Sequence, residues 1–261
     1  MKTPVFAAAL FTTVAAFASS NVAAQEAGAG AVSVDAPAAS ELSFNAAVTS
    51  DYRYRGISQT RLQPALQGGA DYVHKGSGAY VGVWASTIRW TGDAGGDGSV
   101  EIDVYGGLRG DVAPGVGFDV GVLTYVYPSN GLGHVAGFVN ANTTEVYGQL
   151  SYGVASAKYS HAVTNLFGFV DSKNSGYLDL AANPDLGHGV TLNLHAGRQR
   201  VAHNGGASYT DWKIGLTRDV GVVTAALAYL GTNAGKQAYA SPANGKFLGK
   251  SALQLTISKT F

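Results

Sequence analysis

The stretch "SFNAAVTSDYRYRGISQT" (residues 43–60) decides the fold, because apolar and polar residues alternate along it. The apolar and aromatic residues share one parity: Phe44, Ala46, Val48, Tyr52 and Tyr54. The polar and charged residues share the other: Asn45, Thr49, Asp51, Arg53 and Arg55. A period of two is typical of a β-strand with one apolar and one polar face. A helix would scatter the charges around its circumference.

The same alternation recurs to the end of the chain. It is clear in "VEIDVYGGLRGD" (100–111), "TEVYGQLSYG" (144–153), "GVTLNLHAGRQ" (189–199), "YTDWKIGLT" (209–217) and "SALQLTISKTF" (251–261). Weaker segments bring the count to about twelve strands, and no amphipathic helix exceeds two turns. In the segment 79–90, either Val81 and Val83 or Tyr80 and Trp84 could face outward, so its facing stays open.

Composition excludes several classes of protein. Only 13% of the 261 residues are charged, against about a quarter in ordinary soluble domains. The formal net charge is zero, which gives no electrostatic reason to expect a nucleic-acid partner. The chain has no Cys, which suits export to a compartment where thiols are oxidised.

The N-terminal residues predict export. Lys2 precedes an apolar run from Pro4 to Ala18, and "VAA" at 22–24 suits a cleavage site. The alternative, a membrane anchor helix, needs roughly 20 apolar residues. We therefore expect a signal peptide over 1–24, a flexible periplasmic leader over 25–41 and one folded domain over 42–261.

Long and short connections alternate between the expected strands. The turn "KGSG" (75–78) is short, whereas "PSNGLGHVAGFVNANT" (128–143) and "NAGKQAYASPANGK" (233–246) are long. A soluble β-sandwich, the alternative fold, is not expected to alternate long and short connections in this way. Outer-membrane barrels have short periplasmic turns and longer extracellular loops. The fold class predicted is therefore all-β, a closed antiparallel transmembrane β-barrel of about 12 strands.

Barrel closure gives the polar face of each strand a water-filled lumen to face. The pore-lining residues expected are Asp51, Arg53, Arg55, Glu101, Asp103, Tyr105, Arg109, Glu145, Tyr147, Asp179, His195, Asp211 and Lys213. Tyr52 and Tyr54 are expected to point outward into an aromatic girdle. Asp51 could hold Arg53, and the two arginines either set ion selectivity or only pair with acids such as Asp71. The long third and sixth loops are expected to constrict the mouth.

The segments "FNAAVTSDYRYRGISQT", "YVGVWAS", "EIDVYGG", "TEVYGQLSY", "TLNLHAG", "YTDWKIG" and "SKTF" resemble the Gcw_chp family, also called TorF-family porins, over about Leu42 to Phe261. The resemblance implies an outer-membrane barrel and brings no established substrate and no catalytic residues. The terminal Phe261 resembles the C-terminal signal that outer-membrane assembly machinery reads. Lys259 departs from that signal, which more often has an apolar residue there, but a lysine at a membrane rim can snorkel.

A search for catalytic chemistry finds no nucleophile elbow, zinc spacing, P-loop or dinucleotide fingerprint. The spacing of Asp93, Asp97 and Glu101 does not fit a calcium loop. His195, with Asp211 on the next strand, is the best acid–base candidate, and a lumen polar network is the simpler interpretation. Ser160 and His161 are adjacent, so they point to opposite faces of a strand and cannot pair in regular geometry.

The function predicted is a porin-like channel for passive diffusion of small hydrophilic solutes in the outer membrane of a Gram-negative bacterium. Two alternatives remain open: an outer-membrane enzyme acting on lipid, and a plugged structural or surface-binding barrel. The first would need a reactive cluster, so no catalytic, metal or cofactor site is expected. The partners expected are outer-membrane lipid and lipopolysaccharide, the assembly machinery and small polar solutes.

Overall fold

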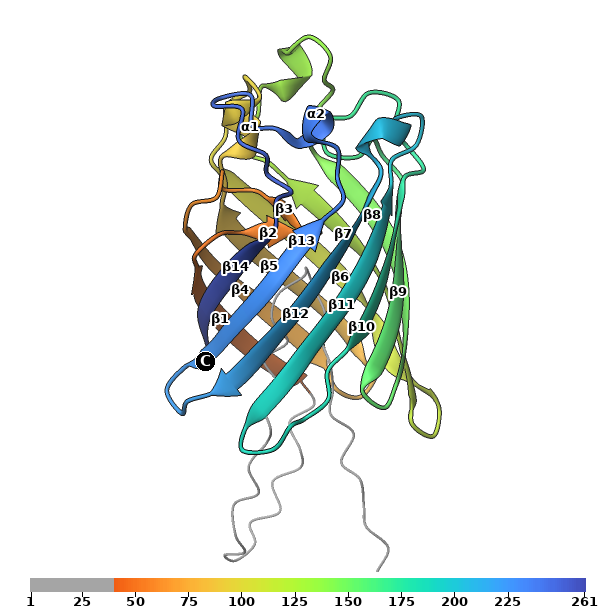
Figure 1. Cartoon of the computed structure of the whole chain (residues 1–261). Helices are drawn as coiled ribbons and strands as arrows, with labels where there is room; N and C mark the ends of the chain where they lie inside the picture. The colour runs from red at the N-terminus through yellow and green to blue at the C-terminus, as the bar shows by residue number, and fades with distance from the viewer. Residues whose placement is uncertain (1–39) are drawn as a thin grey trace, which may run out of the picture.

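The computed structural model describes residues 40–261, in which twelve antiparallel strands close into a barrel (Figure 1). The barrel strands are β1 (Ser40–Thr49), β4 (Ala65–His74), β5 (Ala79–Thr87), β6 (Val100–Ala113), β7 (Val116–Val126), β8 (Thr143–Tyr152), β9 (Ala155–Ala162), β10 (Gly176–Ala182), β11 (Val190–Arg200), β12 (Tyr209–Asp219), β13 (Thr224–Thr232) and β14 (Ala252–Thr260). Each strand pairs with its neighbour along the chain, and β1 pairs with both β4 and β14. The predicted fold class and strand number are confirmed.

The described residues begin with strand β1. Near its start, Glu41 forms an ion pair with Lys75 of the neighbouring turn (3.0 Å). The predicted signal peptide and residues 25–39 of the predicted leader lie outside the described residues.

The connections differ in length at the two ends of the barrel (Figure 1). The short-turn end holds residues 75–78, 114–115, 153–154, 183–189 and 220–223. The long-loop end holds loops 1 to 6, which are residues 50–64, 88–99, 127–142, 163–175, 201–208 and 233–251. Four short helices lie in these loops: α1 (Trp90–Asp93), η1 (Leu132–His134), η2 (Gly205–Ala207) and α2 (Lys236–Tyr239). Within residues 40–261, no helix is long and apolar enough to cross a membrane.

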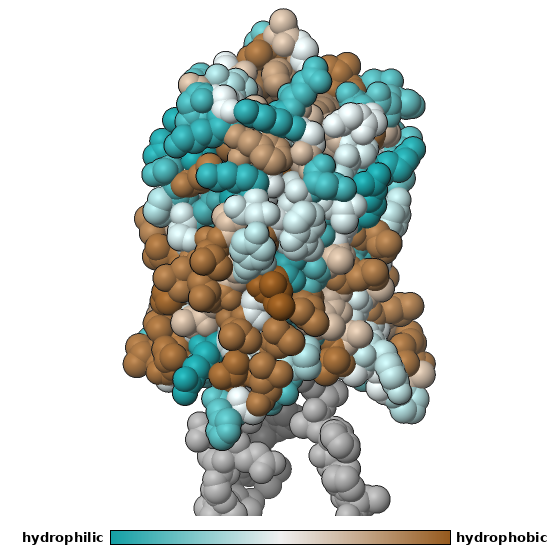
Figure 2. All heavy atoms as spheres, in the orientation of Figure 1, coloured by the Kyte–Doolittle hydropathy of each residue, from teal (hydrophilic) through white to brown (hydrophobic). Residues whose placement is uncertain are grey.

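The outer face of the barrel is apolar. Leu150, Ile214 and Leu255 are exposed as their predicted parity requires, and Leu227, for which no facing was predicted, is exposed as well. Figure 2 shows hydrophobic residues covering the lower part of the barrel wall, while hydrophilic residues gather at the long-loop end. A belt of this kind matches the hydrocarbon layer of a bilayer.

The strand whose facing was open is resolved by the structure. In β5, Val81 and Val83 are exposed on the outer face, and Tyr80 and Trp84 are buried inside the barrel. The large rings fill lumen space, while the β-branched side chains join the outer apolar belt.

Arginine on the outer face of β12 is expected to destabilise the barrel, whereas arginine on its inner face is not. Ile214 is exposed on the outer face at the middle of the strand, and Lys213 points inward beside it. Ile214→Arg is expected to reduce the stability of the assembled barrel by about 2–4 kcal/mol, the cost of a cation near the bilayer midplane. Lys213→Arg keeps an inward cation and should assemble like the wild type. Urea unfolding in lipid vesicles measures both, and equal losses would contradict the assigned facing.

The first strand ends six residues before the prediction had it end. The expected strand continued through Arg55, but β1 stops at Thr49, and β2 (Arg53–Tyr54) and β3 (Ile57–Ser58) form a small separate hairpin. The two residues at its tip, Arg55 (φ 46°) and Gly56 (φ 77°), have the left-handed conformation of a two-residue hairpin turn. A side chain at Gly56 would also meet Thr232, and it would meet the Cβ of Asp211 at 2.9 Å. The hairpin therefore requires glycine here.

The prediction that Tyr52 and Tyr54 point outward into an aromatic girdle is wrong. Tyr52 is 0% exposed and Tyr54 is half-buried, and both pack in the cluster inside the barrel. Apolar and polar residues do alternate in this stretch, but beyond Thr49 the chain leaves the strand and enters the lumen as a loop. Both parities are buried there, so the rule that assigns one parity to lipid no longer applies.

Candidate functional site

Loop 1 crosses the lumen from one wall of the barrel toward the other. It leaves the top of β1, and its tip residue Arg55 reaches Glu145 on β8 and Gln199 on β11. In the barrel order, β11 lies four places from β1 on one side, and β8 lies five places away on the other. The segment therefore lies across the barrel interior near the long-loop end.

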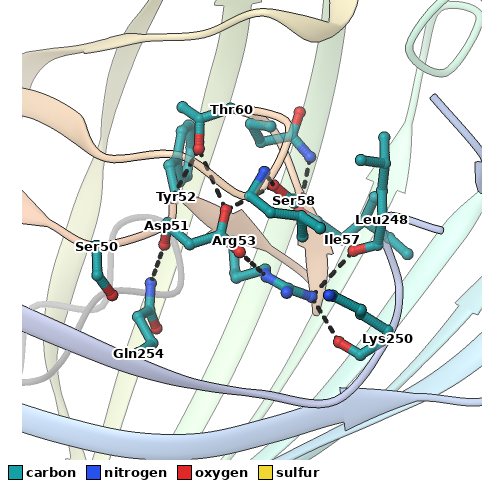
Figure 3. Close-up of polar contacts among 12 residues, drawn as sticks. Ser50, Asp51, Tyr52, Arg53, Ile57, Ser58, Thr60, Leu248, Lys250 and Gln254 are labelled. Carbon is teal, nitrogen blue, oxygen red and sulfur yellow. Dashed lines mark hydrogen bonds and ion pairs between the residues drawn. The ribbon is translucent and has the colours of Figure 1, made fainter. Parts of the chain in front are cut away.

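The Asp51 carboxylate fixes the base of loop 1 (Figure 3). It accepts hydrogen bonds from Arg53 Nε (2.5 Å), Ser58 Oγ (2.5 Å) and Thr60 Oγ1 (3.2 Å). The guanidinium of Arg53 in turn donates to the carbonyl oxygens of Gly56, Leu248 and Lys250. The expectation that Asp51 holds Arg53 is confirmed, and the pair ties loop 1 to loop 6.

Arg55 anchors the tip of loop 1 to the far wall. Its guanidinium donates two parallel hydrogen bonds to Glu145 (2.7 and 3.0 Å) and one to the side-chain oxygen of Gln199 (2.7 Å). It also lies over the ring of Tyr177, with the guanidinium carbon 4.2 Å from the ring centroid. Burial alone would lower the pKa of Arg55, but the Glu145 carboxylate raises it overall, so the group stays charged. A bidentate pair of this kind fixes both position and orientation.

Aromatic rings fill the space around the arms of loop 1. Tyr52 packs edge-on against Trp84 (5.6 Å between centroids), and its hydroxyl donates to Glu101. Tyr54 packs edge-on against Tyr125 (5.5 Å), and the two hydroxyls share a hydrogen bond. Loop 1 is therefore packed against aromatic side chains inside the lumen.

Loops 3 and 6 cover loop 1 from outside. Leu132, Val135 and Phe138 of loop 3 belong to the cluster that contains Tyr52. Leu248 of loop 6 belongs to a second cluster with Ile57. Loops 3 and 6 thus lie over the mouth as expected. Loop 1 reaches across the lumen beneath them, and the sequence interpretation had placed its first half, up to Gly56, in a strand and only residues 57–64 in a loop.

A second polar tier lies below loop 1, toward the short-turn end. The hydroxyl of Tyr80 donates to Asp119 (2.6 Å) and meets that of Tyr147, and the hydroxyl of Tyr105 donates to Asp71 (2.5 Å). Two cations lie over these rings: Arg109 over Tyr80 (5.2 Å to the centroid) and Lys158 over Tyr147 (3.8 Å). Asp71 therefore bonds to a tyrosine, and the arginines of loop 1 find other acids.

His195 lies in a lumen network between two carboxylates. Its Nδ1 contacts Asp179 (3.0 Å) and its Nε2 contacts Asp211 (2.7 Å), while the Tyr177 hydroxyl bonds to Asp211. Both ring nitrogens are thus engaged. The expected proximity of His195 and Asp211 is confirmed, and the geometry is that of the polar network.

The thirteen sequence-predicted pore residues all lie inside the barrel. Asp51, Arg53 and Arg55 belong to loop 1. The other ten lie on inward faces of the strands: Glu101, Asp103, Tyr105, Arg109, Glu145, Tyr147, Asp179, His195, Asp211 and Lys213. That they contact permeating solutes, and that the arginines set selectivity, stays a prediction.

The sequence interpretation missed several inward residues that complete these networks. Lys158, Tyr177 and Gln199 each contact a predicted residue. Asp119 accepts a hydrogen bond from Tyr80 and is the direct cross-strand partner of the predicted Arg109. Asp119 and Lys158 carried a usable signal, since each is a charged residue between apolar neighbours. Gln199 carried none, because its role depends on an arginine 144 positions away.

The residues considered for lipid hydrolysis and for calcium binding do not lie together in the structure. Ser160 is buried inside the barrel, whereas His161 lies on the outer side near Tyr159, as expected for adjacent strand residues. Asp93 pairs with Arg61 in the loops, while Glu101 lies in the lumen. Within residues 40–261, no group of three or more His, Cys, Asp or Glu residues is arranged to hold a metal ion.

Comparison with known proteins gives the family and the fold. Among solved structures, the chain is similar to the KdgM porin (TM-score 0.50, 6% identity, 85% of this chain and 98% of that chain). It is also similar to the NanC porin (TM-score 0.50, 11% identity, 84% and 98%). Likeness at such low identity shows a shared fold alone. A search of curated proteins found no match.

A family model matches residues 33–261, nearly the whole barrel chain. The match confirms the resemblance seen in the sequence motifs. The chain belongs to the Gcw_chp family, described as "Bacterial protein of unknown function (Gcw_chp)".

Proposed function

We propose that this chain is an outer-membrane, porin-like channel for passive diffusion of small hydrophilic solutes, with its narrowest section formed by loop 1. The observation that carries the proposal is the division of the closed barrel into an apolar outer wall and a charged interior. An apolar belt suits lipid, and inward charges are stable only where water or opposite charges reach them. The porin fold supports the same conclusion.

The interior chemistry supports a path for polar solutes with little charge preference. Cations and anions lie near one another in the lumen, as in Arg109 opposite Asp119 on the next strand and Lys213 near Asp179. A twelve-stranded barrel is intermediate between the filled interior of eight strands and the open channel of sixteen. Small solutes that form hydrogen bonds therefore fit this interior better than large or apolar ones.

With the barrel in the outer membrane, its two ends face different compartments. The short-turn end faces the periplasm and the long-loop end faces outward, toward lipopolysaccharide. Phe261 is 67% exposed at the short-turn end, where assembly machinery can contact it. An N-terminal signal peptide accounts for export.

A plugged barrel with a structural or binding role is the second candidate, favoured by the packing of loop 1 across the lumen. A lipid-acting enzyme has less support, since His195 is held inside the barrel between two carboxylates.

Single-channel recording separates the two leading candidates. Purified full-length protein in a planar bilayer is expected to give discrete conductance steps that are smaller than those of a sixteen-stranded porin, because the lumen is narrower. Heat-denatured protein is the control and should give none. A folded protein that inserts without conducting would replace the channel with the plugged barrel.

A further inference from the structure

Two acidic side chains of β6 are buried in the lumen without a cationic partner. Glu101 is 2% exposed and Asp103 is 0% exposed. The two other buried acids of this region are paired, Asp51 with Arg53 and Glu145 with Arg55. No ion pair within residues 40–261 involves Glu101 or Asp103. This corner of the lumen therefore holds two buried acidic groups with no cationic partner among the described residues.

The surroundings of Asp103 offer it nothing that neutralises a charge. Its direct partners on the neighbouring strands are Trp84 and Tyr125, both buried on the same inner face. Directly opposed residues have Cβ atoms about 4.5–5.5 Å apart, so the two rings flank the carboxylate. Tyr52 and Tyr54 of loop 1 pack on these rings. Neither carboxylate oxygen of Asp103 accepts a hydrogen bond from a protein group.

Glu101 differs because tyrosine hydroxyls reach it. It accepts hydrogen bonds from Tyr52 and Tyr127. It lies two residues from Asp103 on one face of β6, about 6.6 Å along the strand, and Glu145 adds a third negative group whose field acts on Asp103. An isolated charge buried in such surroundings is strongly unfavourable unless a counter-charge neutralises it.

We propose that the Asp103 carboxylate binds a small monovalent inorganic cation such as Na⁺, with Glu101 as the neighbouring charge that strengthens binding. Carboxylate oxygens are the ligands that hard cations prefer. A monovalent ion matches the single charge of Asp103, whose carboxylate oxygens accept no hydrogen bond, whereas Glu101 already accepts one from the hydroxyl of Tyr52. The inference rests on the proposed channel only in placing the site beside the solute path, since binding itself needs no conduction.

Unfolding in two salts tests the proposal. The full chain is folded into detergent micelles in NaCl or in N-methylglucamine chloride at equal ionic strength, so that either cation is present while the barrel closes. Na⁺ is expected to raise the urea midpoint relative to the organic cation, because a ligand that binds only the folded state stabilises it. Asp103→Asn is expected to lose this difference. Asp111→Asn, at an exposed position of the same strand, should keep it.

Infrared spectroscopy of the wild type provides a readout that requires no variant to fold. In N-methylglucamine chloride, the protein should show the carbonyl band of a protonated buried carboxyl group, and Na⁺ should convert it to the carboxylate band. Equal midpoints in both salts, an unchanged infrared band, or an equal salt effect in Asp103→Asn would each overturn the site. Neither measurement uses conductance. The cation site can therefore be confirmed or overturned whether or not the barrel conducts.

Discussion

Removing the hairpin of loop 1 is expected to raise single-channel conductance several-fold, because this segment crosses the lumen from β1 to β8 and β11. Residues 51–63 can be replaced by a short Gly-Ser linker between Ser50 and Pro64, since the adjoining strand residues, Thr49 and Ala65, are direct partners. A linker of two to five residues is enough to connect such a pair. Planar-bilayer recording of the variant beside the wild type gives the ratio of conductances.

Trimming the tip of loop 6 provides the matched control. Residues 242–245 are exposed, and the flanking Ser241 and Lys246 are already joined by a backbone hydrogen bond of 2.8 Å. Their deletion shortens an outer loop without reaching the lumen, so conductance should stay at the wild-type value. If the loop 1 variant folds and conducts no better than the wild type, the constriction lies elsewhere.

Arg55→Ala is expected to destabilise the folded barrel by about 3–5 kcal/mol, because it leaves a buried carboxylate without its counter-charge. Glu145 is 1% exposed and receives two hydrogen bonds from the guanidinium that would be lost. Urea unfolding in lipid vesicles measures the change in the free energy of unfolding. The same variant frees the tip of loop 1, so an increase in conductance should accompany the loss of stability.

Two further variants make the interpretation specific. Combining Arg55→Met with Glu145→Leu removes both charges and should recover most of the lost stability, as for other buried ion pairs replaced by apolar groups. Lys75→Ala breaks the exposed pair with Glu41 and should cost at most about 1 kcal/mol. A loss in Arg55→Ala as small as that in Lys75→Ala would show that the anchor contributes little.

Much of the lumen could be predicted because its residues lie on regular strands. Glu101 and Asp103 alternate with Ile102 and Val104, and the structure places the acids inside and Val104 outside. The strand count and the alternation of turns and loops followed from the same pattern. These features depend on neighbours within a few residues.

The contacts between distant strands could not be predicted in this way. Parity places Glu145 inside the barrel, but nothing in the order of residues pairs it with Arg55, 90 positions earlier. The facing of β5 was equally open, because valines and large aromatic rings occupy its two faces.

The sequence by itself determined that this chain is a closed barrel with an apolar outer face and a charged interior, because a period of two fixes which side chains share a face. Only the tertiary structure decided that the charges at Asp51, Arg53 and Arg55 leave the barrel wall and cross the lumen. The turn at Arg55 and Gly56 reverses the chain. The tip of the resulting loop bonds to β8 and β11, and its base bonds to loop 6. The alternation of apolar and polar residues is informative for a strand that has lipid on one side and the lumen on the other. It carries no information about a segment that is surrounded by the barrel on every side, and whose position is set by partners that closure of the barrel brings together.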